Sequence, residues 1–532
     1  MPSQGYRLSP QQKRIWLLQE GSSAYKAQSA ILLQGPLDID ELSKALQSIV
    51  SRHEILRTKF QMLPGMRVPL QVVEEPGRLA LERWDLRGVS LADQREKIEQ
   101  IFGRTRRVRL ELEQDGLLRC VLIELERERH VLMISLPSLC ADRRSLNNMT
   151  REIAGVYEAS LEGEEQADEV IQYAQFAQWQ NGLLEDEGDQ EGRNYWKKQD
   201  RLLVLPSALP LCSPAANAGD FRIESVDIEL AVETVAELQS AALRFQTSVH
   251  TLLLACWYIT LWRLTGEATR VIGCVFDGRP YDVLEHSVGV FARCVPVKCR
   301  CEAHYPFSEV VESVAESVCA ANEWQEYFRW ETRAESISEG AERLFFSAGF
   351  EFEERPKVVA AAGLRISMLS QYSCVDRFHI KLTCTKEGDS WAARFDFDPN
   401  VCHIASARRI AEYFKVTLES MASNPLSRIG ELVLLGPAAR HQLLKEFNDT
   451  ASTFPNGQCI HTLFEGQVDR VPDRVAVVFE DLHLTFAEVN SRADHLAQSL
   501  LNRGVAPEEP VALCVNRSAE TWRSSRYPGR SS

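Results

Sequence analysis

The sequence predicts a mixed α/β protein with more than one domain. Its 532 residues are enough for several domains of ordinary size. Apolar residues recur at helical spacing after Asp38, which can cap a helix with Glu41 as its capping-box partner. Two strand-like runs, 117–125 and 130–136, are separated by a charged tetrapeptide, which predicts a hairpin. Helical and strand-like patterns therefore occur within the same stretch of chain.

The same reasoning assigns the elements that follow. A helix is expected from about Ser145, and Leu202–Asp220 is rich in proline and alanine, which predicts a crossover between two halves. The apolar run Val249–Leu264 is too short to span a membrane and contains His250 and Arg263, so it predicts a buried helix. The second half is expected to contain strands at 271–276, 295–300, 380–384 and 391–397.

A linker is expected at 424–450, with a short helix at 438–447. Beyond residue 460 the pattern predicts a strand at 474–479, and then a helix that Thr485 caps with Glu488 as its box partner.

Gly504 is expected to end this helix and 510–515 to form the next strand. The tail at 523–532 is basic and unpatterned, and we expect it to be disordered.

Composition limits the classes of partner. The net charge of −15 argues against nucleic-acid binding and against an anionic membrane surface. The start of the chain shows no charged segment followed by an apolar run, as a signal peptide would. Fourteen cysteines without regular spacing are then expected to be reduced thiols, and we expect a cytoplasmic protein.

One cysteine cluster raises the question of a metal site. Cys294, Cys299 and Cys301 precede His304, but the paired C-x2-C spacing of zinc sites is missing. We therefore interpret 295–301 as a strand and expect no metal.

Four motifs in the first 440 or so residues match the signatures of one family. The stretch 52–60 matches the signature Arg-His-Glu-x-Leu-Arg-Thr-x-Phe in full. Three other motifs match with substitutions: Leu8–Trp16 with Pro10 for Ala, Tyr173–Trp179 with Gln175 for Asp, and Val288–Arg293 with Arg293 for Asn. By these motifs the first 440 or so residues resemble the condensation domain of nonribosomal peptide synthetases, and residues 460–522 resemble the start of an adenylation domain.

The resemblance implies the architecture and the partners. It implies two lobes that each resemble chloramphenicol acetyltransferase and form a V-shaped pseudodimer, with substrates delivered on the phosphopantetheine arms of carrier proteins and no cofactor of its own. The expected parts are an N-lobe at 1–180, a C-lobe at 181–425, a linker at 426–459, an incomplete adenylation start at 460–522 and the tail at 523–532.

The stretch Pro137–Arg143 departs from the family at its catalytic motif, His-His-x-x-x-Asp-Gly. Pro137 and Ser138 stand at the two histidine positions and Arg143 at the glycine. Serine cannot accept a proton near neutral pH as imidazole can, and losing a general base typically lowers a rate by about 10²–10⁴. Arg143 is expected to project into the tunnel that the family uses.

Asp142 matches the motif, and the resemblance implies a structural role in which it pairs with a basic residue of the other lobe. Lys298 or Arg300 is the expected partner.

A covalent mechanism is the weaker interpretation of this loop. Ser138 or Cys140 as a nucleophile needs an adjacent base. No histidine lies nearby in sequence, so His286, His304 or His379 would have to approach the loop in space to supply it.

Three hypotheses for function remain. The chain is a condensation-type domain that binds carrier proteins in trans, or tailoring enzymes, with weak or no bond formation. Alternatively it is an active acyltransferase that uses Ser138 or another group. Third, it is a nonfunctional product truncated from a longer synthetase, since 460–522 lacks the Gly-rich phosphate loop of adenylation domains.

Overall fold

The computed structural model describes residues 5–19, 22–108, 112–113, 117–162, 170–186, 190–200, 209–212, 220–330, 345–452, 457–506, 509–512 and 514. The tail expected to be disordered and most of the expected crossover lie outside these residues. The chain divides into two compact units, 1–440 and 441–532. No helix within the described ranges is long and apolar enough to cross a membrane.

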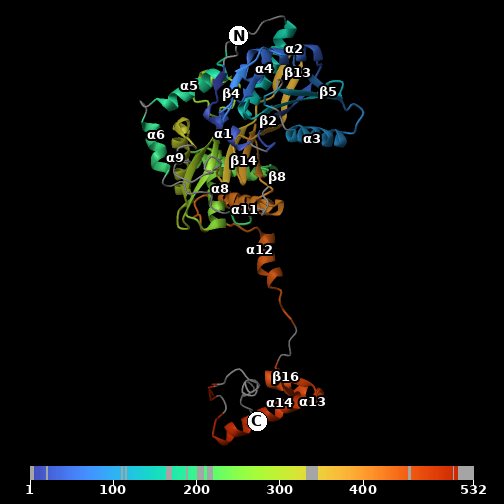
Figure 1. Cartoon of the computed structure of the whole chain (residues 1–532), viewed down its shortest axis with the longest axis vertical. Coiled ribbons are helices and arrows are strands. Elements are labelled where there is room, and N and C mark those ends of the chain that lie inside the picture. The colour runs from blue at the N-terminus through green and yellow to red at the C-terminus, as the bar shows by residue number, and fades with distance from the viewer. Residues whose placement is uncertain are drawn as a thin grey trace. The chain divides into compact units, whose positions relative to one another are not determined.

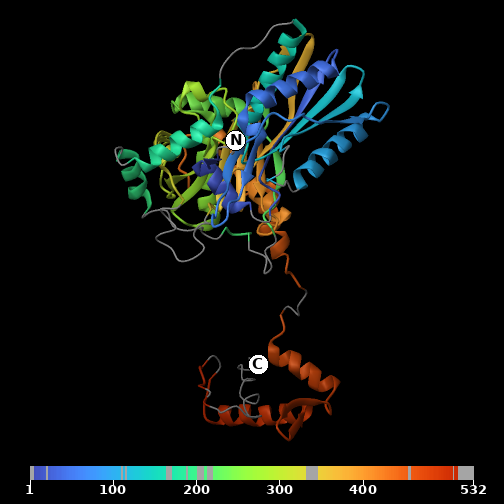
Figure 2. The same cartoon turned by 45° about the horizontal axis from the view of Figure 1, so that its top comes forward.

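The first unit contains an N-terminal sheet whose six strands include two from the second half of the chain. Their order is β12 (Val359–Ala361), β13 (Leu364–Ser373), β2 (Lys26–Gln34), β7 (Arg129–Pro137), β6 (Arg119–Glu126) and β5 (Leu81–Asp85). Helices α2 (Ile39–Arg52) and α4 (Arg143–Glu162) pack together, and α4 lies against β2, β12 and β13, while α3 (Leu91–Arg107) contacts β2 and β7 (Figures 1 and 2). Because β13 pairs with β2, a segment of the second half completes the first lobe.

A second six-stranded sheet forms the other lobe of this unit. Its order is β10 (Arg293–Arg300), β9 (Thr269–Phe276), β11 (Ala348–Glu354), β14 (Ile380–Glu387), β15 (Ser390–Phe397) and β8 (Glu224–Glu229). The helices that pack on it are α7 (Val232–Arg244), α8 (Val249–Thr265), α9 (Phe307–Glu323) and α11 (Ile404–Ser423) (Figure 1).

The strands of this second sheet have one apolar and one polar face. Along β11, Phe350 belongs to the helix-covered core while Glu351 points to the opposite face, as the two-residue period of a strand requires. In β14, Leu382 and Lys381 alternate in the same way. The polar face is the one that meets α4 of the first lobe, because Arg143 pairs with Glu351.

Smaller elements of the first unit complete the frame. They are strands β1 (Gly5–Arg7), β3 (Thr58–Gln61) and β4 (Leu70–Val73), helices α1 (Pro10–Leu18), α5 (Tyr173–Glu185) and α6 (Glu191–Asp200), and the 3-10 helices η1 (Glu54–Arg57), η2 (Asp282–Leu284) and η3 (Gln325–Tyr327).

Most predicted elements of this unit are confirmed. The hairpin is β6 and β7, the apolar helix is α8, and the predicted strands correspond to β9, β10, β14 and β15. Asp38 caps α2 by accepting from the amides of Asp40 and Glu41. The Glu41 carboxylate accepts from Lys44 and Ser160 rather than closing the expected capping box.

Helix α12 (Pro437–Leu444) begins at the end of the first unit and, with η5 (Glu446–Asn448), continues the predicted linker helix into the second unit. That unit then contains α13 (Ile460–Arg470), the two-stranded sheet β16 (Val475–Phe479) and β17 (Leu482–Thr485), and α14 (Phe486–Asn502). Thr485 and Glu488 form the predicted capping box of α14.

The prediction of a strand at 510–515 is wrong for the residues described there. Pro510, Val511, Ala512 and Cys514 form no strand. A strand requires a neighbour for its backbone groups, and in the described part of this unit β16 pairs with β17 alone.

Candidate functional site

The loop 137–143 connects β7 to α4, and its residues 137–142 are buried inside the first unit. Ser138 donates its backbone amide to the Tyr25 carbonyl at 3.2 Å, and Cys140 closes a turn onto Pro137 at 2.9 Å. The Ser138 side chain is fully buried, and its Oγ has no hydrogen-bond partner among the described residues. The hydroxyl at the predicted base position therefore has no proton acceptor beside it.

Asp142 is the centre of a buried hydrogen-bond cluster. Its two oxygens accept from Arg279 Nη1 at 3.0 Å and Nη2 at 3.1 Å. The backbone amides of Phe291 and Ala292 donate to Oδ2 at 2.8 and 2.9 Å. The Ser145 amide and hydroxyl donate to Oδ1 at 2.8 and 2.7 Å. A carboxylate with six donors is fixed in place and serves as a structural tie between the lobes.

Electrostatics agrees with this geometry. Burial raises the pKa of the Asp142 carboxyl. The charge of Arg279 and the hydrogen bonds from Arg279 and Ser145 together lower this pKa by more than burial raises it. The net pKa lies below its ordinary value, so Asp142 is a carboxylate near neutral pH.

The predicted partner of Asp142 was wrong. Arg279 fills that role with a side chain that is 2% exposed, whereas Arg300 is 62% exposed and pairs with Glu302. Lys298 lies on the same strand as Arg300, and both line a cavity whose wall does not include Asp142.

The local backbone explains why Arg279 reaches Asp142. Gly278 has a φ of +72°, and a Cβ there would lie 2.0 Å from the Phe291 carbonyl oxygen. Only glycine permits this approach, which brings Arg279 and the Phe291 amide to the same carboxylate. The one sequence signal that could have indicated this contact was a glycine followed by an arginine after a strand.

Three of the four recognised motifs meet in this framework. Tyr173 donates to the Val290 carbonyl at 2.8 Å, and its hydroxyl lies 2.7 Å from Ser9 Oγ. Ser145 Oγ accepts from the Gly289 amide at 3.0 Å. Segments far apart in sequence therefore meet around Asp142, and His53, of the fully matched motif, pairs with Glu152 at 2.6 Å.

Arg143 spans the two lobes. From the start of α4 it donates from Nε to Glu351 Oε1 at 2.9 Å and also pairs with Glu353, both on β11. Lys381 Nζ binds the other Glu351 oxygen at 2.6 Å. We call Arg143, Glu351, Glu353 and Lys381 the interlobe network. All four side chains are at least 85% buried, because their exposures are 15%, 9%, 10% and 7%.

The charges of the interlobe network stabilise one another. Burial raises the pKa of Glu351, but the charges of Arg143 and Lys381 lower it to about 2. Burial lowers the pKa of Arg143, and the charges of Glu351 and Glu353 then raise it above its ordinary value. Arg143, which we expected to project into a tunnel, is thus held by the opposite lobe.

Within the described ranges, the structure brings no base to Ser138 or Cys140. Burial raises the pKa of the Cys140 thiol far above its ordinary value. His304 is 66% exposed beside Glu302, and His379 packs on Phe345 with a pKa that burial lowers to about 4. His286 is exposed as well. In the described residues none of the three histidines hydrogen-bonds to Ser138 Oγ.

Cys294 and Cys299 lie on β10, in the strand that the sequence analysis favoured over a metal site. Among the residues that the structure describes, no group of three or more histidine, cysteine, aspartate or glutamate side chains could hold a metal ion.

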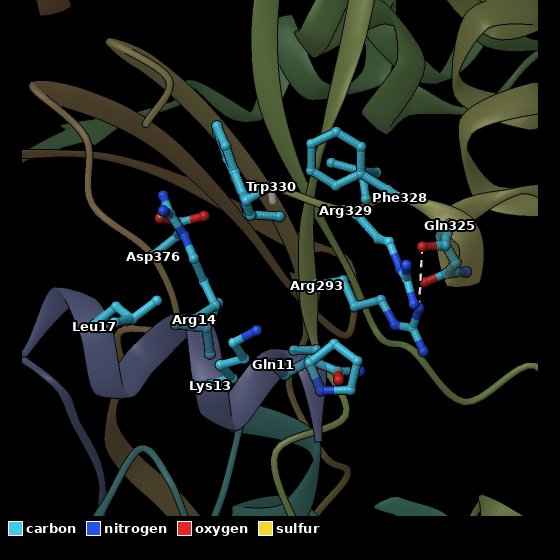
Figure 3. Close-up of a pocket in the computed structure, with 15 residues that line it drawn as sticks. Gln11, Lys13, Arg14, Leu17, Arg293, Gln325, Phe328, Arg329, Trp330 and Asp376 are labelled. Carbon is cyan, nitrogen blue, oxygen red and sulfur yellow. Dashed lines mark hydrogen bonds and ion pairs between the residues drawn. The ribbon is translucent and has the colours of Figure 1, made fainter. Parts of the chain in front are cut away.

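A cavity opens between α1, β10, η3 and the segment that follows β13 (Figure 3). Its empty volume, part of which is open to solvent, is about 800 Å³. We call it the α1 cavity. A smaller neighbouring cavity shares Cys294, Val375 and Asp376 with it and reaches Lys381 of the interlobe network. The principal lining side chains are Gln11, Lys13, Arg14, Leu17, Arg293, Gln325, Phe328, Arg329, Trp330 and Asp376.

Two family models match the chain. Condensation domain matches residues 3–444, and AMP-binding enzyme matches residues 464–522. The chain is 28% identical over 530 residues to tyrocidine synthase 3 of Brevibacillus parabrevis, covering 97% of this chain and 8% of that protein. It is 26% identical over 524 residues to bacitracin synthase 2 of Bacillus licheniformis, covering 97% and 19%. The chain therefore spans a small part of these relatives.

Solved structures show the same fold. The first condensation domain of the calcium-dependent antibiotic synthetase, in complex with a substrate analogue, matches with a TM-score of 0.70 at 20% identity, covering 82% of this chain and 100% of that one. The X-domain in its complex with OxyB from teicoplanin biosynthesis matches with a TM-score of 0.69 at 24% identity, covering 82% and 97%. The chain belongs to the condensation-domain family of nonribosomal peptide synthetases, and its condensation domain is followed by the start of an AMP-binding domain.

Proposed function

We propose that this chain is a condensation-type module that docks carrier proteins in trans and forms peptide bonds weakly or not at all. One observation carries the proposal. Arg143 is tied across the lobes to Glu351 and Glu353, while the adjacent Ser138 is sealed and has no proton acceptor beside it. Because the lobes stay tied together, the fold keeps its binding surfaces. The histidine position, however, holds no group that can take a proton from an amine.

The framework supports a folded and binding-competent module. Asp142, Arg279 and Ser145 form a buried cluster in which both Asp142 oxygens accept hydrogen bonds, so the altered loop is still anchored as a unit. Loss of chemistry in this loop is therefore compatible with an intact lobe interface.

The active-acyltransferase alternative requires Ser138 or another group to take the place of the histidine. The burial of Ser138 Oγ counts against it.

A second candidate role is recruitment of a tailoring enzyme. The observation that favours it is the similarity to the X-domain, which was solved in complex with OxyB. The experiment below distinguishes the two roles, because only the carrier role requires the phosphopantetheine arm.

We expect the full chain to bind phosphopantetheine-loaded carrier domains saturably and one-to-one in isothermal titration calorimetry. The same carriers without the arm are the matched control and should bind more weakly, because the arm adds contacts inside the protein. Absence of binding to any loaded carrier domain from a set drawn from homologous synthetases contradicts the carrier role. Equal binding with and without the arm also contradicts it.

A further inference from the structure

Two buried cysteines of the second lobe face each other, although 190 positions separate them in the sequence. Cys212 lies in the crossover expected at 202–220, and Cys402 lies between β15 and α11. The two residues are partners in an isolated antiparallel bridge, and their Sγ atoms lie 2.7 Å apart. Residues directly opposite each other in an antiparallel pair have Cα atoms about 4.5–5.5 Å apart, within the range of about 4.4–6.8 Å that a disulfide spans. The backbone therefore holds the two thiols where a disulfide can form.

The turn 209–212 presents Cys212 to this bridge. The Cys212 amide donates to the Leu209 carbonyl at 3.0 Å and closes a four-residue turn in which Pro210 is second. Leu211 is third and has a φ of +73°, which a type II turn requires but a bulky side chain rarely adopts. Such strain persists only where surrounding contacts impose it. Here Leu209 and Cys212, at the two ends of the turn, are both buried in the core of the second lobe.

The turn that carries Cys402 is also held by hydrogen bonds. The Cys402 amide donates to the Asp398 carbonyl at 2.9 Å. The side-chain amide of Asn400 donates to Asp398 Oδ1 and to the Asp220 carbonyl, each at 2.9 Å. The crossover is therefore attached to this turn at two points, Cys212 and Asp220.

The two thiols differ in a way that suits an attacking and a resolving cysteine. Cys212 is 6% exposed and follows the exposed Pro210 and Leu211, whereas Cys402 is fully buried. The hydrogen bond between the thiols lowers the pKa of Cys212 by more than burial raises it. The same contact and burial both raise the pKa of Cys402. Because the thiolate is the nucleophile in disulfide exchange, Cys212 is the group that attacks first.

We propose that Cys212 and Cys402 are a redox-sensitive pair, which a small-molecule disulfide such as oxidised glutathione converts into a disulfide bond. The Cys212 thiolate attacks one sulfur of the oxidant, breaks its S–S bond and releases one glutathione thiolate. Cys402 then loses its proton and displaces the second glutathione thiolate from Cys212, which forms the new S–S bond. In total the two cysteines lose two electrons and two protons, and the oxidant gains both and becomes two molecules of glutathione thiol.

The bond ties the crossover covalently to the second lobe. It closes a long loop, since 190 positions separate the two cysteines. Closing a long loop restricts the unfolded chain, so the disulfide is expected to stabilise the folded protein. The pair needs no carrier protein, so this proposal stands or falls independently of the docking role.

The test incubates the native full chain with oxidised glutathione and then blocks the remaining thiols with N-ethylmaleimide. Mass spectrometry of non-reduced tryptic peptides should find the peptides of Cys212 and Cys402 joined. Cys212→Ser and Cys402→Ser should each abolish this cross-link. Cys319→Ser, at an exposed cysteine of α9, is the matched control and should retain it.

Stability supplies the second measurement. The urea midpoint of the first unit should be higher by roughly 0.5 M in the oxidised protein than in the reduced protein. Dithiothreitol should reverse this shift, and neither serine variant should show it. Cys402→Ala, which removes the buried thiol without adding a hydroxyl group, should also lack the cross-link and guards against misfolding of the serine variant.

Three results overturn the proposal. In the first, Cys212 and Cys402 stay reduced under conditions that convert the exposed Cys319 into a mixed disulfide with glutathione. In the second, Cys212 keeps glutathione as a stable mixed disulfide that Cys402 does not displace. In the third, the cross-link forms but the urea midpoint of the oxidised protein equals that of the reduced protein.

Discussion

Replacing Asp142 by alanine is expected to lower the free energy of unfolding of the first unit by about 3–5 kcal/mol, the usual cost of removing one partner of a buried ion pair. The variant removes the buried acidic partner of Arg279, whose side chain is 2% exposed, and leaves it the half-exposed Asp277 as a partner. It also leaves the amides of Phe291 and Ala292 without their acceptor. Urea denaturation followed by tryptophan fluorescence measures the change.

The controls for this prediction come from the residues first expected to pair with Asp142. Lys298→Ala and Arg300→Ala should change stability by no more than about 0.5 kcal/mol, because neither contributes to the cluster. A double-mutant cycle of Asp142→Ala with Arg279→Ala should be strongly non-additive, because the two side chains form one unit. An unchanged stability of Asp142→Ala contradicts the structural role assigned to this carboxylate.

Replacing Glu351 by alanine is the second change with a large expected effect. It leaves both Arg143 and Lys381 with less compensation in a region where their exposures are 15% and 7%. We expect a loss of about 3–5 kcal/mol in the free energy of unfolding. Glu354→Ala, on the same strand but 61% exposed and paired with Lys386, is the matched control. It should cost no more than about 1 kcal/mol.

The pH dependence of stability tests the same network. The pKa of Glu351 is about 2 in the folded protein against an ordinary value of 4.5. A carboxyl whose pKa is depressed on folding contributes stability that is present above its ordinary pKa and is lost as the pH falls toward its folded pKa. The wild type should therefore lose stability between about pH 4.5 and pH 2 more steeply than Glu351→Gln. Parallel curves for the two proteins contradict the network.

The sequence was sufficient where short-range patterns decide the structure. The hairpin β6–β7, the buried helix α8 and the capping box of α14 each follow from spacing and a few capping residues. Such features depend on neighbours only a few positions apart, so pattern and propensity specify them.

The sequence was insufficient where long-range contacts decide the structure. Arg279 binds Asp142 from a loop without periodicity, at a separation of 137 residues. Glu351 lies on β11, a strand that the sequence analysis did not predict, so the direction of Arg143 could not be inferred. The strand predicted at 510–515 had the right residue types, but a strand needs a paired neighbour.

The most direct test of the central claim is a single-turnover condensation assay with a loaded donor carrier and an amine-bearing acceptor carrier, read by intact-protein mass spectrometry. The account predicts wild-type product at the level of the enzyme-free control and no effect of Ser138→Ala. The double variant Ser138→His/Arg143→Gly should exceed the wild type at least tenfold, because it supplies a proton acceptor and removes the interlobe arginine. Efficient wild-type condensation that Ser138→Ala abolishes contradicts the account and establishes serine as the catalytic group.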